Sequence, residues 1–226
     1  MTPVVNLIGI TKPSIFTGCM NANELIAYAA RVSNPSNQNN TKTATKLVKY
    51  LIKEGHWSPF EMVSVTMEIK TTRDISRQIL RHRSFSFQEF SQRYAVSEGF
   101  VFDREARTQH PKNRQLSLPI DDIQDPITEN WTMLQAEVVG KAKDAYEMAL
   151  NMGIAKEQAR ALLPEGLTET TLYMAGTLRS WIHYCELRRG HGTQAEHIEV
   201  ADRCWEIIEA HFPEVVEAIN EIHASS

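Results

Sequence analysis

Residues 63–70, with the sequence VSVTMEIK, decide the predicted fold class because their apolar residues recur at every second position. A strand with one buried face has this period. The residues on the predicted buried face are Val63, Val65, Met67 and Ile69. Immediately upstream, an apolar stripe of helical period consists of Leu47, Val48, Leu51 and Ile52. Thr43 is placed to cap the first turn of this helix, and Gly55 is placed to end it. The chain is therefore expected to pass from a helix into a half-buried strand.

Outward from this strand, helices and strands are mixed without the regular βαβ order of a parallel sheet. Further strands are predicted at residues 4–11 and 168–175, and helices at residues 21–33, 71–83, 126–151, 155–163, 176–189 and 193–212. This mixture favours an α+β fold in a single domain over residues 1–226. We expect a small, mostly antiparallel or mixed sheet that packs against several helices.

Three segments of the second half carry more specific expectations. Residues 97–125 are polar and are expected to form a long, partly irregular excursion. Pro126 suits the first turn of the long helix that follows. The expected apolar face of that helix consists of Trp131, Leu134, Val138, Ala142 and Ala145. Beyond Pro213 we expect a frayed tail.

Composition excludes several classes of protein. The 226 residues are 42% hydrophobic and 23% charged, as in soluble globular proteins. The sequence has no run of about 18 apolar residues, which predicts no membrane span, and its first residues lack the pattern of a signal peptide. The three cysteines are Cys19, Cys185 and Cys204. Because they are few and lack metal-ligand spacing, we expect reduced thiols and a cytoplasmic protein.

Positive charge is concentrated in one part of a mildly acidic chain. The formal net charge is -4, yet residues 70–94 hold six basic residues against only Asp74 and Glu89. The basic residues are Lys70, Arg73, Arg77, Arg81, Arg83 and Arg93. Proteins that bind nucleic acid or anionic membranes are more often basic overall. The local excess therefore favours a small anionic ligand over a nucleic acid or a membrane.

Three of these arginines, Arg73, Arg77 and Arg81, fall on one face of the predicted helix 71–83. Like charges four residues apart repel by about 0.2–0.5 kcal/mol per pair on an isolated helix. Acidic residues elsewhere could pair with Arg73 and Arg77. Arg81 and Arg83 differ because they lie at the predicted helix end, where guanidinium groups suit phosphate oxygens. The aromatic residues that follow could stack on a ligand ring or pack in the core.

Residues 81–94 read RHRSFSFQEFSQRY, and this segment resembles the signature of flavin-dependent thymidylate synthases. The short family pattern is R-H-R followed by seven residues and Ser, here Ser91. The longer pattern, R-H-R-x-x-S-x-N-E-x-S-x-R-Y, also fits, except that Gln88 stands where Asn is usual. Four other segments match family motifs in the same order, namely ARVS (30–33), GHWSPFE (55–61), EQARALLP (157–164) and LRRGHGTQAEHIE (187–199). The resemblance spans residues 20–210 of the sequence.

The resemblance implies an enzyme that moves a one-carbon unit from methylenetetrahydrofolate to C5 of dUMP. FAD is the implied cofactor, NADPH the implied reductant, and no metal is implied. The nucleotide phosphate, the FAD pyrophosphate and the glutamate tail of folate are all anionic, which accounts for a local arginine cluster. The family also builds its active sites between the subunits of a homotetramer.

The resemblance assigns roles to individual positions. Around FAD it places His56, Ser58, Arg81, His82, Arg83, Glu89 and His183. Around dUMP it places Gln78, Arg81, Glu89, Ser91, Gln92, Arg93, Arg160 and Arg188. Arg160 would reach the site of a neighbouring subunit. Arg188 is the expected catalytic residue, because a fixed cation beside the uracil ring favours loss of the N3 proton and makes C5 nucleophilic.

Some of these positions also have ordinary structural explanations. Glu89 could form an ion pair with Arg83 or Arg93, which would contribute little if exposed. His56 could satisfy the end of the preceding helix, and His183 could be a core residue.

Other ambiguities concern the C-terminal motif. Arg189 competes with Arg188, and only the motif match selects Arg188. His191 and His197 lie near two glutamates but lack the H-E-x-x-H order of a zinc site, so we expect no metal.

Two departures from the family pattern leave alternatives open. Gln88 is one methylene longer than the usual Asn, and Thr177 stands where some members place an Asn near FAD. A related enzyme that acts on UMP or installs a hydroxymethyl group is one rival. The other is a nucleic-acid-binding module that uses the basic, aromatic segment 81–94.

Overall fold

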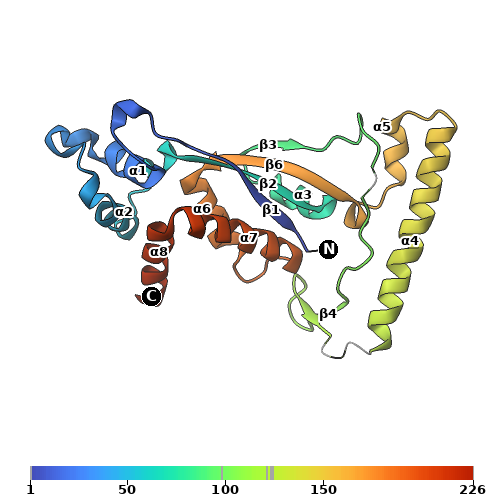
Figure 1. The fold of residues 1–226 in the computed structure, drawn as a ribbon. Helices are drawn as coiled ribbons and strands as arrows, with labels where there is room; N and C mark the ends of the chain where they lie inside the picture. The colour runs from blue at the N-terminus through green and yellow to red at the C-terminus, as the bar shows by residue number, and fades with distance from the viewer. Residues whose placement is uncertain (1, 98, 121, 123–124, 226) are drawn as a thin grey trace.

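A four-stranded antiparallel sheet forms the centre of the computed structural model, which describes residues 2–97, 99–120, 122 and 125–225 (Figure 1). In sheet order the strands are β1 (Val4–Ile10), β2 (Ser64–Thr72), β6 (Glu169–Thr177) and β3 (Ser86–Glu89). A separate hairpin consists of β4 (Arg107–Gln109) and β5 (Ser117–Pro119). The helices of the described residues are α1 (Ala22–Ala30), α2 (Ala44–Lys53), α3 (Arg73–Ile79), α4 (Pro126–Asn151), α5 (Lys156–Ala159), α6 (Leu178–Arg188), α7 (Ala195–His211) and α8 (Pro213–Ser225). This is the predicted α+β architecture.

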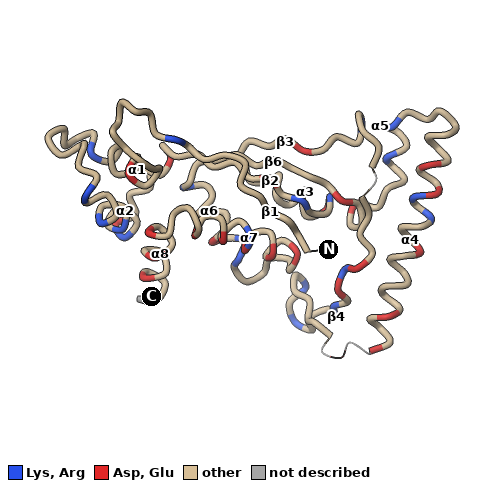
Figure 2. The backbone as a smooth tube through the Cα atoms, in the orientation of Figure 1, with Lys and Arg blue, Asp and Glu red and all other residues tan. Residues whose placement is uncertain are grey.

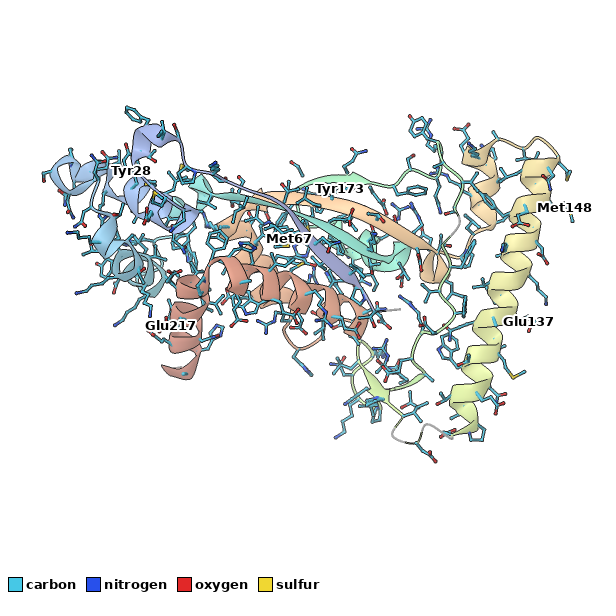
Figure 3. The ribbon with its side chains drawn as sticks, viewed as in Figure 1. Tyr28, Met67, Glu137, Met148, Tyr173 and Glu217 are labelled. Carbon is cyan, nitrogen blue, oxygen red and sulfur yellow. The ribbon has the colours of Figure 1, made fainter. Side chains whose placement is uncertain are left out.

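The alternation in β2 produces the two faces of the sheet. Met67 and Ile69 are completely buried, and the antiparallel register places them opposite Met174 and Leu172 of β6. Figure 3 shows Met67 on the side of the sheet that faces α7 and Tyr173 on the opposite side. Each apolar side chain buried in this layer contributes about 1.5–3 kcal/mol. The core therefore lies between the sheet and the pair α6 and α7.

The C-terminal segment is an ordered part of this core, so the expectation of a frayed tail is wrong. Residues 213–225 form α8, which packs against α2. The buried residues of this helix include Val215, Val216, Ala218 and Ile219. Lys49 of α2 also lies 2.7 Å from Glu217. Pro213 ends one helix and begins the next, because a first-turn proline needs no backbone hydrogen bond there.

Helix α4 begins and ends at the predicted residues, but its predicted apolar face is largely exposed. Trp131, Leu134 and Val138 are 39%, 55% and 46% exposed. The helix instead buries Val139, Tyr146 and the polar residue Gln135, toward the segment that precedes β4. In Figure 1, α4 stands apart from the sheet, and Figure 2 shows acidic and basic residues along its length.

Local signals around α2 were partly correct. Gly55 has a φ of 68°, and this left-handed conformation after the helix is the one that glycine adopts easily. Thr43 precedes the helix, but its side chain caps no backbone N–H. Its hydroxyl instead accepts a hydrogen bond from Arg31 at 2.7 Å. In the part of the chain that the structure describes, no helix is both long and apolar enough to span a membrane.

Candidate active site

The R-H-R segment forms the turn between α3 and β3. The backbone N–H of His82 donates to the carbonyl oxygen of Ile79, which ends α3. Phe85 then packs edge-on against Trp181, with ring centroids 4.9 Å apart. A Cβ on Gly176 would collide with the Phe85 ring, so the close approach of this turn to β6 requires glycine there. Packing against β6 and α6 thus fixes the position of residues 81–83.

Helix α6 brings Arg188 to the same place. Thr177 caps its first turn by accepting from the backbone N–H of Ser180 at 3.2 Å, so a capping role accounts for Thr177. Eleven residues of helix then place Arg188 at the C-terminal end. Arg188 Nε donates to His82 Nε2 at 2.8 Å. Arg189, the competing candidate, donates to Asp202 at 2.7 Å instead.

The electrostatics of this contact keep His82 neutral. Burial, together with Arg188 and His183, lowers the pKa of His82 to about 4. Neutral His82 can accept from Arg188 through Nε2. Among the described residues, no carboxylate forms an ion pair with Arg81, Arg83 or Arg188. The turn therefore presents positive charge that the described chain does not neutralise.

His183 and Ser84 line a hollow of about 490 Å³ beside this turn, together with Trp57 and Arg179. His183 is exposed on α6, so it is not a core histidine. Ser58 begins the short helical turn Ser58–Met62, directly after Trp57.

His56 is also exposed, and its backbone satisfies the end of the preceding helix. Its backbone N–H donates to the carbonyl oxygen of Leu51 at 2.8 Å and closes the end of α2. Its ring lies 6.3 Å from that of Tyr50.

Glu89, at the other end of β3, has different partners from those expected. It accepts hydrogen bonds from Ser76 at 2.8 Å and Thr170 at 3.1 Å. The arginines that pair with it are Arg73 and Arg77, each 3.7 Å away, rather than Arg83 or Arg93. Burial lowers the pKa of Arg73, and Glu89 opposes this shift. Acidic residues thus pair with the first two arginines of the stripe.

A cleft of about 400 Å³ opens beside this ion-pair cluster. Its lining residues include Arg73, Arg77, Gln92, Glu157, Arg160 and Glu165. Arg160 therefore joins Gln92 although the two are far apart in sequence. Nη1 of Arg73 is buried without a hydrogen-bond partner. The sequence did not identify Arg73 and Arg77 as site candidates, because the spacing of residues along a helix does not show which cleft they line.

The remaining predicted nucleotide residues lie near this end of β3 or in the core beside it. Gln92 is buried and donates to Ser97 at 2.9 Å. Arg93 lies 3.5 Å from Glu157, and Ser91 Oγ accepts from the backbone N–H of Arg93.

The other predicted nucleotide residue, Gln78, lies on α3 and donates to Gln194 at 2.8 Å. One chain therefore brings the predicted residues together in two groups, one around the contact between His82 and Arg188 and the other around Glu89. Gln88, which stands where the family pattern has Asn, lies in β3 opposite Tyr173 and is exposed.

Two of the cysteines are core residues. Cys185 and Cys204 are completely buried. Burial raises the pKa of both thiols. Neither suits a thiolate nucleophile at neutral pH.

Comparison with known proteins identifies the class. A model of the family described as thymidylate synthase complementing protein matches residues 16–214. The chain is 50% identical over 214 residues to a probable flavin-dependent thymidylate synthase of Paramecium bursaria Chlorella virus 1, and the match covers 95% of this chain and 97% of that protein. It is also 50% identical over 218 residues to a flavin-dependent thymidylate synthase of Synechocystis sp., with coverage of 95% and 98%.

A solved structure gives the same assignment at the level of the fold. The chain matches a UMP/dUMP methylase from Streptomyces cacaoi, crystallised with 5-Br dUMP, with a TM-score of 0.81 and 25% identity. The match covers 97% of this chain and 95% of that one. The class is that of the flavin-dependent thymidylate synthases. The chain belongs to this family.

Proposed function

We propose that this chain synthesises dTMP from dUMP, with methylenetetrahydrofolate as one-carbon donor, FAD as cofactor and NADPH as reductant. Family membership supports this activity. In the structure, the contact between Arg188 and His82 carries the proposal. The two residues are 106 positions apart, and they come from two separate segments that match family motifs.

The residues before β3 fit an anionic cofactor with a flat ring system. The guanidinium groups of Arg81 and Arg83 lack carboxylate partners among the described residues and suit a pyrophosphate. Trp57 lines the adjacent hollow and offers an aromatic surface. Residues proposed to hold FAD are His56, Ser58, Arg81, His82, Arg83, Glu89 and His183. Reduced FAD supplies the hydride that completes the methyl group.

Arg188 is proposed to activate the uracil ring. Its Nε donates a hydrogen bond to neutral His82, and this bond fixes the guanidinium plane. Its terminal nitrogens remain as donors toward a ligand. A donor held in this way stabilises the negative charge that appears when the ring loses its N3 proton. The resulting charge makes C5 nucleophilic toward the one-carbon unit.

The cleft lined by arginines beside Glu89 is proposed to receive the phosphate of dUMP. Arg73, Arg77 and Arg160 line it and suit the oxygens of a phosphate. The full set of residues proposed to hold dUMP, beyond Arg73 and Arg77, is Gln78, Arg81, Glu89, Ser91, Gln92, Arg93, Arg160 and Arg188.

We further propose a homotetramer whose active sites lie at subunit interfaces. The resemblance to a family that builds its active sites between subunits supports this shared arrangement. The apolar face of α4 supports assembly, since Trp131, Leu134 and Val138 are exposed. We expect light scattering to give about four times the 25.7 kDa chain mass. An active monomer would contradict the shared site.

The decisive experiment measures flavin content and product together. Freshly purified protein should be yellow, with roughly one FAD per chain, and should convert dUMP to dTMP when given methylenetetrahydrofolate and NADPH. Colourless protein that also takes up no FAD at micromolar concentration would overturn the proposal. Salt-sensitive binding of oligonucleotides without a chromophore would favour the nucleic-acid-binding rival instead.

A second substrate, UMP, has one observation in its favour. The structurally similar protein from Streptomyces cacaoi is a UMP/dUMP methylase. Turnover of UMP and dUMP should therefore be compared at equal concentration, with product mass separating methyl from hydroxymethyl. We expect dUMP to be preferred, because the relatives with 50% identity are thymidylate synthases.

A further inference from the structure

A line of buried and partly buried hydrogen bonds links α3, α6 and α7. At its centre, His197 of α7 is completely buried. Its Nε2 lies 3.1 Å from the Tyr184 hydroxyl, and its Nδ1 lies 3.3 Å from Gln78 Oε1. Gln78 Nε2 donates to Gln194 Oε1 at 2.8 Å, and Gln194 Nε2 donates to Glu196 Oε2 at 2.9 Å. Gln78 of α3 is thus connected to four side chains from α6, α7 and the loop between them, namely Tyr184, His197, Gln194 and Glu196.

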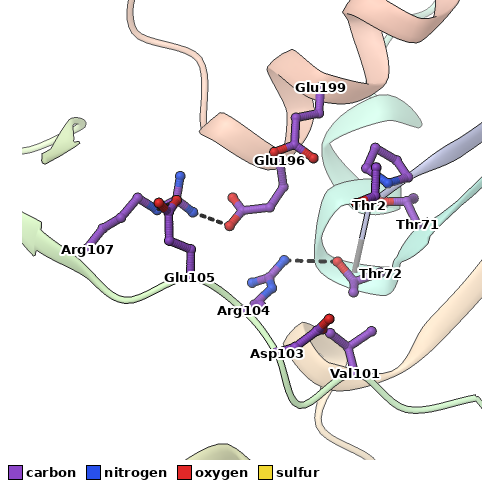
Figure 4. Close-up of a pocket in the computed structure, with 11 residues that line it drawn as sticks. Thr2, Thr71, Thr72, Val101, Asp103, Arg104, Glu105, Arg107, Glu196 and Glu199 are labelled. Carbon is purple, nitrogen blue, oxygen red and sulfur yellow. Dashed lines mark hydrogen bonds and ion pairs between the residues drawn. The ribbon is translucent and has the colours of Figure 1, made fainter. Parts of the chain in front are cut away.

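Glu196 fixes the direction of the line. Its other carboxylate oxygen pairs with Arg107, which comes from the excursion before α4 (Figure 4). An ionised carboxylate can only accept hydrogen bonds. Gln194 must therefore turn its amide nitrogen toward Glu196 and its oxygen toward Gln78. Gln78 must then offer its nitrogen to Gln194, which leaves its oxygen facing His197.

The same logic assigns the proton on His197. Facing an oxygen acceptor on Gln78, Nδ1 must carry the hydrogen, so Nε2 must accept from Tyr184. Tyr184 can donate because burial raises the pKa of its hydroxyl well above the ordinary value. Burial, with Arg188 and His82, lowers the pKa of His197 to about 3, so the ring carries only one proton near neutral pH. All four hydrogen bonds from Tyr184 to Glu196 can therefore form only with this one assignment of donors and acceptors.

We propose that His197 and Tyr184 are positioning residues that lock the side-chain amide of Gln78 in one orientation for the nucleotide. The inference rests on the proposed function, in which Gln78 holds dUMP. Gln78 is partly exposed. Its second N–H and its second oxygen lone pair are therefore presented at fixed places. If the amide were free to flip, its donor and acceptor would exchange places and mismatch the ligand.

The position of the pair supports a role beyond packing. The Tyr184 ring lies edge-on to His82, with ring centroids 4.9 Å apart, and His82 accepts from Arg188. The line thus ends against the proposed catalytic contact. An apolar pair of similar volume would fill the same space without leaving polar groups to satisfy.

The test compares three variants in the assembled, FAD-loaded enzyme. His197→Leu removes the donor to Gln78, and we expect KM for dUMP to rise about tenfold with kcat nearly unchanged. His197→Asn places an amide N–H near the former Nδ1 and should restore KM to within about threefold of the wild type. Tyr184→Phe removes only the donor to Nε2 and should give an intermediate KM. Unchanged KM in all three variants, with only the melting temperature lowered, would overturn the proposal.

A second measurement does not depend on the substrate. Nitrogen-15 spectra of histidine-labelled protein distinguish the two neutral tautomers of His197, which His197→Asn assigns by the signal that it removes. We expect the Nδ1–H form. An Nε2–H form would overturn the inference even if dUMP is turned over. A wild-type protein that binds no dUMP would instead refute the proposed function, and the tautomer would still decide whether Gln78 is locked.

Discussion

The two ends of β3 balance their arginines in different ways. At the Glu89 end of the strand, Arg73 and Arg77 of α3 both pair with Glu89 inside a hydrogen-bonded cluster. At the Ser86 end, where Arg188 of α6 contacts His82, no carboxylate among the described residues pairs with Arg83 or Arg188. A cluster that contains its own counter-charge can stabilise the ligand-free fold. Cations without one contribute little to the fold and are available for an anionic ligand. We therefore expect the cluster around Glu89 to stabilise the fold as well as to line the phosphate cleft, whereas Arg83 and Arg188 should matter mainly once a ligand is bound.

Removing the counter-charge should have the largest effect on stability. Glu89→Gln leaves the buried guanidinium of Arg73 without a carboxylate, so we expect the ligand-free protein to lose about 3 kcal/mol of unfolding free energy. Chemical denaturation measures this loss. The matched control at the other end is Arg83→Ala, which should change stability by no more than about 0.5 kcal/mol. Equal effects at both ends would remove the contrast between them.

Arg188→Ala tests whether an arginine without a carboxylate partner activates the uracil ring. We expect deuterium exchange at C5 of dUMP to slow by about 100- to 1000-fold, or about 2.7–4 kcal/mol, while FAD stays bound. The control is Arg189→Ala, because Arg189 is already paired with Asp202. Its exchange rate should stay near that of the wild type. Normal exchange in Arg188→Ala would assign the activation of the ring to another group.

Arg160→Ala asks whether the two ends meet across an interface. Losing one charged contact to a phosphate should raise KM for dUMP by about 10- to 100-fold, which corresponds to about 1.5–3 kcal/mol. Co-assembly with Arg188→Ala subunits provides the sharper experiment. If sites are shared, mixed tetramers contain some sites with both native arginines and regain activity. No recovery in mixed tetramers would place both arginines in the site of one subunit.

The smallest effect is expected for the cysteines. If Arg188 activates the ring, no thiolate is needed, and Cys185 and Cys204 are buried with raised pKa values. The triple change Cys19→Ser, Cys185→Ser, Cys204→Ser should keep flavin-dependent turnover within about tenfold, or about 1.4 kcal/mol, because it damages packing only. An inactive triple variant that still folds and binds FAD, with Cys185→Ser alone equally inactive, would show that the mechanism requires a thiol.

Much of the fold followed from local sequence patterns. The alternation in 63–70 and the helical periods are consequences of backbone geometry, which is why β2, α4 and α6 begin and end near their predicted residues. The failures have a different origin. Periodicity placed Trp131, Leu134 and Val138 on one apolar face of α4, yet these side chains remain 39%, 55% and 46% exposed. Periodicity reports which residues share a face, and it does not report what lies against that face.

The sequence by itself determined the α+β class, the family motifs and the concentration of arginines, because each is a property of residues close together in the chain. Only the tertiary structure decided which charges are paired. It joined Glu89 to Arg73 and Arg77, His82 to Arg188, and Gln78 to His197. Ion pairs and hydrogen bonds act over a few ångströms in space, whereas their partners lie up to 119 residues apart along the chain. Packing of α6 and α7 against the sheet brings those partners into contact.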